Sequence, residues 1–187
     1  MSAKVGFGVD IGGSGIKAAR VDLDTGELIG ERSKIATPYP ATAENVVPVV
    51  DQLVREAGWT GPYGCTFPGI VKHGHILSAA NLGDSWIGSD FDQTLEQHSG
   101  VDVAILNDAD AAGLAEVRYG AAKGRGGLII ITTLGTGIGS ALVNDGVLIP
   151  NAELGHLIMH GDSAEKWAAS SAKDRDKFSY FEWAKRF

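Results

Sequence analysis

The sequence predicts a mixed α/β protein built from two similar lobes that face each other across a cleft. Two observations carry this prediction. In each half of the chain a strand-like run enters a glycine-rich turn and a second strand follows, at residues 5–21 and again at 128–143. Between these segments an apolar run ends on a polar pair and leads into an Ala-rich helix, an order that is typical of α/β sheets.

The first third of the chain predicts an antiparallel meander. Residues 5–9 form a β-rich run that stops at Asp10 and a glycine turn. Apolar alternation resumes at residues 16–21 and 28–35, and Asp24-Thr25-Gly26 supplies the chemistry of a hairpin turn between them.

An amphipathic helix is expected at residues 43–57, because five apolar side chains recur on one side of it and Gly58 follows as a terminator. A strand at 64–67 stops at Pro68-Gly69. The next expected elements are a small hairpin arm at 73–77, a polar loop at 80–88 and a short helix at 90–98.

Residues 101–106 are nearly all apolar, which predicts a strand covered on both faces. A helix is expected at 109–119, a hairpin from 128–133 and 138–143, and a turn at 144–146. The last segment predicts a helix at 164–172 and then aromatic residues at helical spacing up to Phe187. Such a stripe needs a cover, either an oligomer partner or further chain.

The composition excludes several classes of protein. No run approaches the ~20 apolar residues that span a bilayer, and the N-terminus lacks the apolar core of a signal peptide, so we expect a soluble, cytoplasmic protein without a membrane partner. The net charge of −7 argues against general nucleic-acid binding. A single cysteine, Cys65, excludes an internal disulfide and a Cys-only zinc site, and we expect its thiol to be buried.

The first glycine turn suits a phosphate. Gly12, Gly13 and Gly15 remove side chains where a phosphate approaches the backbone, while Ser14 and Lys17 offer a hydroxyl and an ammonium group. An ordinary glycine-rich hairpin is the alternative, since the run matches neither a Walker loop nor the dinucleotide motif. Asp10, directly before the turn, favours the phosphate interpretation because a carboxylate holds a metal ion or its waters beside phosphates.

The second glycine turn contains Gly135, Thr136 and Gly137. Its backbone amides and its Thr hydroxyl group also suit a phosphate, with a plain hairpin as the alternative.

Asp108 is the strongest catalytic candidate. A carboxylate with an ordinary pKa of ~3.9 is ionised at pH 7 and accepts the proton of a sugar hydroxyl as that oxygen attacks phosphorus. Asn107 would orient the same sugar through its amide. Alternatively, the pair merely caps the helix that follows. Further along, Glu153 and His156 place a carboxylate and an imidazole close together, which suits hydroxyl recognition or a structural histidine.

With these motifs in hand, the chain resembles the sugar kinases of the repressor, open reading frame, kinase (ROK) family. The resemblance rests on residues 10–15, 107–113, 134–139 and 153–156 and covers essentially the whole chain. Through residues 66–70, 78–81 and 164–166 it is most similar to the polyphosphate- and ATP-dependent glucokinases and glucomannokinases of actinobacteria.

This resemblance implies an actin-like ATPase fold with two ribonuclease-H-like lobes, at residues 1–106 and 107–187, the second of them incomplete. It implies phosphoryl transfer from polyphosphate, and from ATP, to the 6-hydroxyl of glucose or mannose, with Asp108 as the base. The sugar would be held by the side chains of Asn81, Asn107, Glu153, His156 and Glu165. Asp10 and the glycine turns would surround the phosphate and its Mg²⁺.

The chain also departs from the family pattern. Many members carry a Cys-rich zinc motif after the Gly-His pair, and this chain has none, so no zinc is expected. Members of the family continue to a further Gly-rich segment and a closing helix, so the chain looks truncated at its C-terminus, and a homodimer is expected for the full-length form. The alternative hypothesis is a non-catalytic sugar-binding or regulatory member of the same family.

Overall fold

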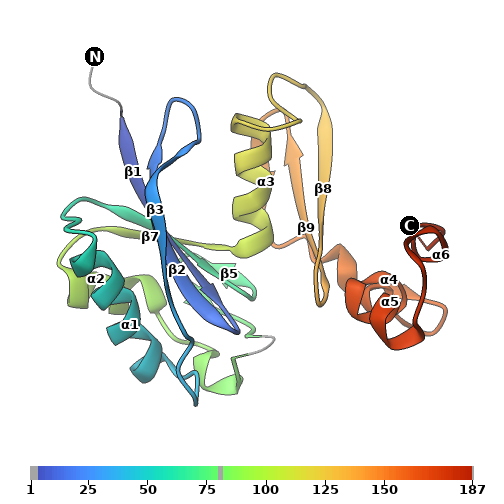
Figure 1. Ribbon diagram of the computed structural model, residues 1–187, viewed down its shortest axis with the longest axis horizontal. Coiled ribbons are helices and arrows are strands. Elements are labelled where there is room, and N and C mark those ends of the chain that lie inside the picture. The colour runs from blue at the N-terminus through green and yellow to red at the C-terminus, as the bar shows by residue number, and fades with distance from the viewer. Residues whose placement is uncertain (1–3, 80–81, 187) are drawn as a thin grey trace. The chain divides into compact units, whose positions relative to one another are not determined.

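The computed structural model describes residues 4–79 and 82–186 of the chain. It divides into two compact units, Met1–Ala111 and Ala112–Phe187, each of which has its own sheet (Figure 1).

The first unit is built on a five-stranded mixed sheet. The strands lie in the order β3-β2-β1-β4-β7, in which β3, β2 and β1 are antiparallel and β1, β4 and β7 are parallel. Their bounds are β1 Val5–Gly12, β2 Gly15–Asp22, β3 Leu28–Ile35, β4 Tyr63–Phe67 and β7 Val103–Asn107. The predicted meander of the first three strands is confirmed.

The strand register brings polar residues to one end of this sheet. Asp10 lies opposite Lys17 in the antiparallel pair and opposite Thr66 in the parallel pair. Asn107 ends β7 opposite Phe67. Because the parallel strands β1, β4 and β7 all end at this edge, the glycine turn, the Pro68-Gly69 turn and Asp108 follow from it together.

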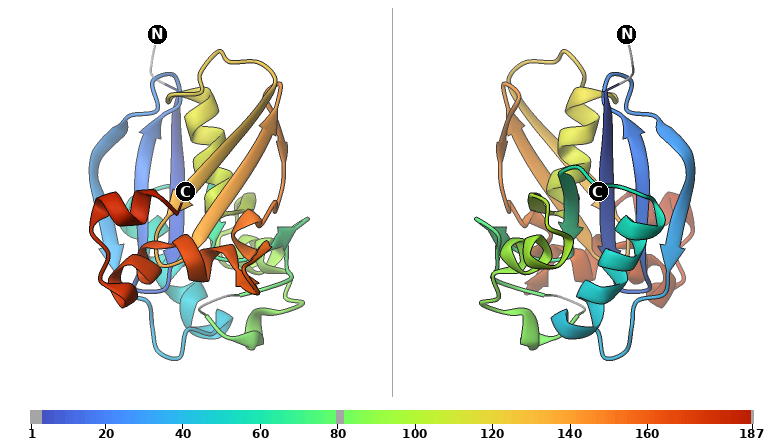
Figure 2. Two further views of the ribbon diagram at one scale, coloured as in Figure 1. Left: turned by 90° about the vertical axis from the view of Figure 1, so that its right-hand side faces the viewer. Right: turned by 90° about the vertical axis from the view of Figure 1, so that its left-hand side faces the viewer.

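Two helices cover one face of the sheet (Figure 2). They are α1 (Ala43–Glu56), which contains Pro48, and α2 (Phe91–Ser99). Both were predicted. Val46 and Val50 of α1 have no exposed surface and pack in one core with Val9 and Ile11 of β1. Burial of this apolar face supplies most of the stability of the unit.

Helices α1 and α2 do not cover the opposite face of the sheet, here called the open face. Alternate residues on β4 and β7, among them Gly64 and Ala104, are exposed and line a groove of about 380 Å³. Within the first unit, therefore, helices cover only one face of β7, and the cover expected on its other face stays a prediction. Val103 and Ile105 are buried under the helices, but Ala104 on the other face is not. The apolar run at residues 101–106 thus combines two faces of β7, one packed under the helices and one made of small and aliphatic side chains.

Short elements close the first unit. They are β5 (Val71–Lys72), β6 (His75–Ile76) and the 3₁₀ helix η1 (Asp84–Trp86). Within the predicted polar loop, Trp86 is fully buried and packs at a tilt against Phe67 and edge-to-face against Phe91. Its indole N–H donates to the carbonyl oxygen of Ala41. The loop is thus anchored in the core by one aromatic ring.

The second unit contains an antiparallel sheet in the order β10-β9-β8, formed by β8 (Leu128–Leu134), β9 (Ile138–Asn144) and β10 (Val147–Ile149). The predicted hairpin across the second glycine turn is confirmed. Helix α3 (Asp108–Arg118) enters this unit and approaches β9 at Gly113, where an added Cβ would collide with the side chain of Ala141. Gly113 therefore sets how closely the helix and the strand pack.

The predicted helix at 164–172 is interrupted. The structure has α4 (Ala164–Ala168) and α5 (Ser170–Asp176), separated by Ala169 in an extended conformation (ψ 163°). Ser170 instead donates its backbone N–H and its hydroxyl to the carbonyl oxygen of Gly135. The sequence pattern missed the break because these contacts are non-local. The remaining elements are η2 (Leu154–His156), β11 (Ile158–Met159), β12 (Asp162–Ser163) and α6 (Tyr180–Ala184).

The terminal aromatic stripe is largely exposed. Tyr180 and Phe181 on α6 keep 75% and 73% of their surface accessible, and lysine side chains lie over both rings. Phe187 lies outside the described residues. Over the described ranges, no helix has both the length and the apolar character needed to cross a membrane.

Candidate active site

Asp10 is the centre of a polar cluster in the first unit. Its Oδ2 accepts a hydrogen bond from the Lys17 ammonium group at 2.9 Å, and its Oδ1 accepts one from the Thr66 hydroxyl at 2.9 Å. The carboxylate is held from both neighbouring strands in a single orientation. Thr66 was not among the predicted site residues, because only the pairing of β1 with β4, 56 residues apart, reveals its place.

The first glycine turn is a two-residue hairpin loop. Gly12 and Gly15 form the last paired positions of β1 and β2, so Gly13 and Ser14 occupy the exposed tip. The carbonyl oxygen of Gly12 accepts a hydrogen bond from the Thr37 hydroxyl. A side chain at Gly15 would displace the end of the Lys34 side chain, since an added Cβ would lie 2.5 Å from Cε of Lys34.

Asn107 is committed to the local structure. It is buried, with 7% of its surface exposed, and its side-chain amide donates to the carbonyl oxygen of Gly69 at 3.0 Å. Its Oδ1 accepts the backbone N–H groups of Ala109 and Asp110, which caps α3. The capping alternative is thus present in the structure, and a direct contact of Asn107 with sugar stays a prediction.

Asp108 is the first residue of α3 and its side chain is exposed to solvent. The surrounding protein nevertheless desolvates the carboxyl group, and this raises its pKa above the ordinary value. The backbone N–H of Ala109 opposes the shift, whereas the negative charge of Asp10 adds to it. A raised pKa makes this carboxylate a stronger base than an ordinary aspartate.

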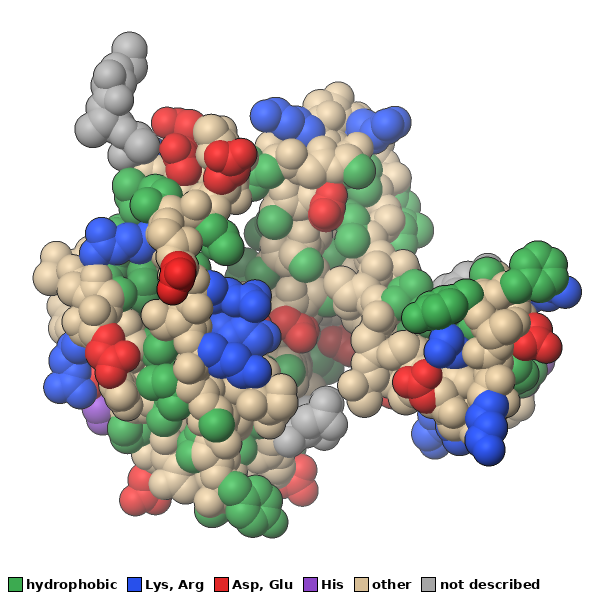
Figure 3. Space-filling view, in the orientation of Figure 1, with side chains coloured by type: hydrophobic (Ala, Val, Ile, Leu, Met, Phe, Trp, Pro, Cys, Tyr) green, Lys and Arg blue, Asp and Glu red, His purple; other side chains and the backbone are tan. Residues whose placement is uncertain are grey.

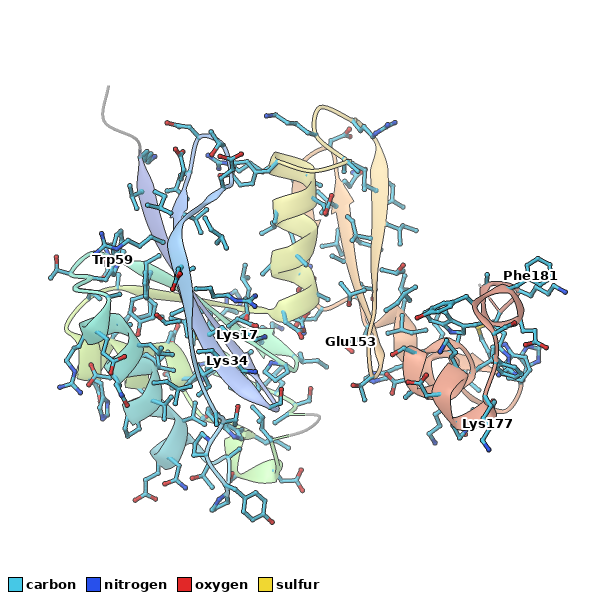
Figure 4. All side chains as sticks on the ribbon, in the orientation of Figure 1. Lys17, Lys34, Trp59, Glu153, Lys177 and Phe181 are labelled. Carbon is cyan, nitrogen blue, oxygen red and sulfur yellow. The ribbon has the colours of Figure 1, made fainter. Side chains whose placement is uncertain are left out.

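In the second unit, an imidazole lies between two carboxylates. His156 Nδ1 lies 3.3 Å from Oε2 of Glu153, and its Nε2 lies 3.7 Å from Oε1 of Glu165. The segment is fixed on β9, because the backbone N–H of Leu154 donates to the Ser140 hydroxyl and Gly155 packs against the backbone of Ile138. The structure thus brings together three of the predicted sugar-binding residues (Figure 4 labels Glu153).

The second glycine turn is tied to the same cluster. Gly137 faces Glu165, so that an added Cβ would lie 2.5 Å from the Oε2 of that residue. The carbonyl oxygens of Gly135 and Thr136 accept hydrogen bonds from the hydroxyls of Ser170 and Ser171. Sequence reasoning missed both serines, whose only signal is their position directly after α4.

The described residues contain no group of three or more His, Cys, Asp or Glu side chains that could hold a metal ion. Asp10 is a lone carboxylate beside the first glycine turn. Mg²⁺ commonly binds through one or two carboxylates, water and substrate phosphates, so this donor set fits a water-mediated site. Asn81, predicted to hold sugar, lies outside the described residues. Cys65 is buried as expected.

Comparisons with known proteins agree on one family. A family model described as "ROK family" matches residues 6–172. The polyphosphate glucokinase of Mycobacterium tuberculosis is 53% identical over 182 residues, which are 97% of this chain and 69% of that protein.

Solved structures agree with the sequence comparison. The inorganic polyphosphate/ATP-glucomannokinase of Arthrobacter sp. strain KM has 48% identity and a TM-score of 0.90, over 97% of this chain and 75% of that one. The ROK family glucokinase of Streptomyces griseus, solved with glucose and AMPPNP, has 31% identity and a TM-score of 0.79, over 92% of this chain and 59% of that one. The predicted α/β fold class is confirmed.

Proposed function

The chain belongs to the ROK family, and from this premise we propose that it transfers a phosphoryl group from polyphosphate, and from ATP as a second donor, to the 6-hydroxyl of glucose. Mannose is proposed as a second acceptor. One observation carries the proposal. A carboxylate held beside a glycine turn, Asp10, lies near the end of β1, and a carboxylate with a raised pKa, Asp108, directly follows β7 at the same edge of one sheet.

In the proposed reaction Asp108 acts as the general base. Its carboxylate accepts the proton of the 6-hydroxyl, the resulting oxygen attacks the terminal phosphorus of the donor, and the shortened donor leaves with the electrons of the broken P–O bond. The raised pKa of Asp108 brings its basicity closer to that of a general base working at neutral pH. Asn107 keeps this carboxylate in place by capping α3 and binding Gly69.

The phosphate site is proposed at the two glycine turns. Gly12, Gly13, Ser14, Gly15 and Lys17 would bind the donor in the first unit, and Gly135, Thr136 and Gly137 in the second. Backbone N–H groups of such turns form concavities that bind anions. The Ser170 and Ser171 bonds hold the second turn in shape.

The sugar site is proposed at the side chains of Asn81, Asn107, Glu153, His156 and Glu165. Carboxylates accept hydrogen bonds from sugar hydroxyls, and an imidazole both donates and accepts. The position of His156 between the two glutamates supports this role, because it gathers three side chains that suit sugar hydroxyls.

Mg²⁺ is the proposed cofactor, bound through water to Asp10, and zinc is not part of the proposal. When bound, the metal neutralises charge on the phosphates. The chain's own contribution is to hold the Asp10 carboxylate in one orientation through hydrogen bonds from Lys17 and Thr66.

We further propose a cytoplasmic enzyme that acts without nucleic acid or membrane partners and forms a homodimer in its full-length form. The net charge of −7 supports the proposal that the enzyme acts without a nucleic-acid partner. The exposed rings of Tyr180 and Phe181 support the proposed homodimer, since an apolar surface of this kind favours a protein contact.

A coupled assay for glucose 6-phosphate tests the function. With long-chain polyphosphate or ATP, glucose and Mg²⁺, product is expected from the wild-type chain and not from Asp108→Ala. Absence of product with both donors would overturn the proposal. Calorimetry on the same sample then identifies the alternative, because glucose binding without phosphorylation would indicate a non-catalytic sugar-binding protein.

A further inference from the structure

Three cations gather at the edge of the first sheet, next to the glycine turn. Lys17 on β2 lies directly opposite Lys34 on β3, and Arg32 lies two residues from Lys34 on the same strand. Residues two apart on a strand share a face and lie about 6.8 Å apart. Figure 4 labels Lys17 and Lys34 close to each other, and Figure 3 shows basic side chains gathered over β2.

Two of these three charges have no counterion in the described part of the chain. Lys17 pairs with Asp10, whereas Lys34 and Arg32 are exposed and make no ion pair among the described residues. Like charges placed directly opposite each other on a sheet are destabilising. In a chain whose net charge is −7, this unpaired basic edge has no structural benefit to explain it.

Lys34 lies over the glycine turn itself. Its Cε is the atom that a Cβ on Gly15 would strike, so the end of its side chain lies beside the residue at which β2 leaves the turn. Arg32 continues the positive charge away from the turn along β3, which is the edge strand of this sheet among the described residues. Arg32 also lines the groove on the open face of the sheet, together with Lys17.

We propose that Lys34 and Arg32, continuing from Lys17, form a binding track for the polyphosphate chain beyond the phosphate that is transferred. This inference rests on the proposed function. Polyphosphate carries a negative charge on every phosphate, so each further cation along the track adds a favourable electrostatic contact. ATP instead presents an uncharged nucleoside after its three phosphates. The track therefore favours long polyphosphate over ATP.

A single-stranded nucleic acid is a different polyanion and is the less suitable occupant. Proteins that bind single strands stack bases on aromatic side chains, and the groove beside Arg32 contains none among its lining residues. A competing oligonucleotide in the binding assay distinguishes the two.

The test uses Lys34→Gln, Arg32→Gln, the double variant and the conservative Lys34→Arg. Lys4→Gln is the matched control, because Lys4 is equally exposed but precedes the far end of β1. For each variant we would measure KM and kcat with long-chain polyphosphate, tripolyphosphate and ATP, and the affinity for polyphosphate at several salt concentrations. Tm is recorded throughout.

Each single Gln variant is expected to raise KM for long polyphosphate by about two- to fivefold, the size of effect of one exposed charge contact, and to leave KM for ATP nearly unchanged. The slope of log affinity against log salt should fall by about 0.7 per cation removed. Lys34→Arg should keep the wild-type values because it keeps the charge. In the Gln variants Tm should not fall, since the repulsion between neighbouring cations is relieved.

An equal rise of KM for polyphosphate and ATP would overturn the track. So would a loss of polyphosphate affinity no larger than that of Lys4→Gln. Complete displacement of polyphosphate by an oligonucleotide of equal charge would also overturn it. These outcomes can be distinguished from failure of the proposed function. In that case the wild-type chain itself makes no glucose 6-phosphate from either donor, and the binding arm still decides whether Lys34 and Arg32 hold polyphosphate.

Discussion

The side-chain amide of Asn107 donates to the carbonyl oxygen of Gly69 at 3.0 Å, which ties the end of β7 to the turn that follows β4. The same side chain accepts two backbone N–H groups at the start of α3. One buried amide thus fixes the turn, the strand and the helix from which Asp108 projects. This relationship makes Asn107 a positioning residue for the proposed base.

Replacing Asn107 by Ala is expected to lower the free energy of unfolding by about 1–3 kcal/mol, because buried partners lose their hydrogen bonds. Urea denaturation measures this loss. Asn45→Ala is the matched control, since the Asn45 amide also bonds to a carbonyl oxygen, that of Pro40, but at the surface. Its loss should stay below about 1 kcal/mol. Equal losses for the two variants would contradict the assignment.

Asp108→Asn is expected to reduce kcat by roughly 10²–10⁴ while leaving glucose affinity nearly unchanged, because the amide cannot accept the proton. Steady-state kinetics and calorimetry measure the two quantities. Its Oδ1 still accepts the Ala109 N–H, so the start of the helix should be kept. A reduction of kcat below about tenfold would rule out Asp108 as the base.

The same variant has a predicted effect on stability. Because the pKa of Asp108 is raised on folding, ionising this group costs free energy at neutral pH, and the stability associated with its protonated form is lost as pH rises through the folded-state pKa. Asp108→Asn should therefore have a higher Tm than wild type at pH 7. The difference should vanish below the ordinary aspartate pKa of ~3.9. A lower Tm at pH 7 would contradict the direction of the shift.

The raised pKa is also directly measurable. Carbon-13 NMR of the carboxyl groups should give Asp108 a pKa above ~3.9, and the acidic limb of the kcat/KM profile should move upward with it. Asp10→Asn removes one negative charge that contributes to the shift, so the pKa of Asp108 should fall in that variant. An unchanged or higher value would show that Asp10 does not act on it.

Much of the fold was predictable because its signals are local. The five apolar positions of α1 and the turn residues between β2 and β3 appear within single windows of sequence, and the structure has both elements. The two glycine turns and Asp108 could be found for the same reason. In each case the side-chain types needed for the chemistry stand next to one another in the chain.

The contacts that define the site geometry were not predictable in this way. Thr66 reaches Asp10 only through the register of β1 with β4, and Ser170 reaches Gly135 across 35 residues. The break at Ala169 follows from that second contact, since the helix pattern of residues 164–172 contains no local signal for it. Long-range pairing decides these details, and no window of sequence contains it.

Cys65 offers a test of the core. The thiol is fully buried on β4, and desolvation raises its pKa well above the ordinary range. Only the thiolate reacts with disulfide reagents, so labelling of the native protein should be slow and should accelerate on unfolding in urea. As the chain contains a single cysteine, the signal reports this position alone. Rapid labelling without denaturant would contradict the burial.

Gly137 and Gly135 form a matched pair in the second glycine turn. An Ala at 137 would place its Cβ 2.5 Å from Oε2 of Glu165, whereas an Ala at 135 meets no atom within 4 Å. Gly137→Ala must therefore displace the Glu165 carboxylate, which also lies near His156. Glucose affinity, measured by calorimetry, is expected to fall by about tenfold, the equivalent of ~1.4 kcal/mol for one hydrogen bond to a charged group.

Gly135→Ala leaves Glu165 in place and should bind glucose with an affinity close to that of wild type. Neither glycine adopts a positive φ, so the two substitutions carry no backbone strain and differ only in what the new methyl group meets. Equal affinities for both variants would show that Glu165 does not contact the sugar. Equal losses would point to the turn itself, and the sugar-binding role of Glu165 would then have to be withdrawn.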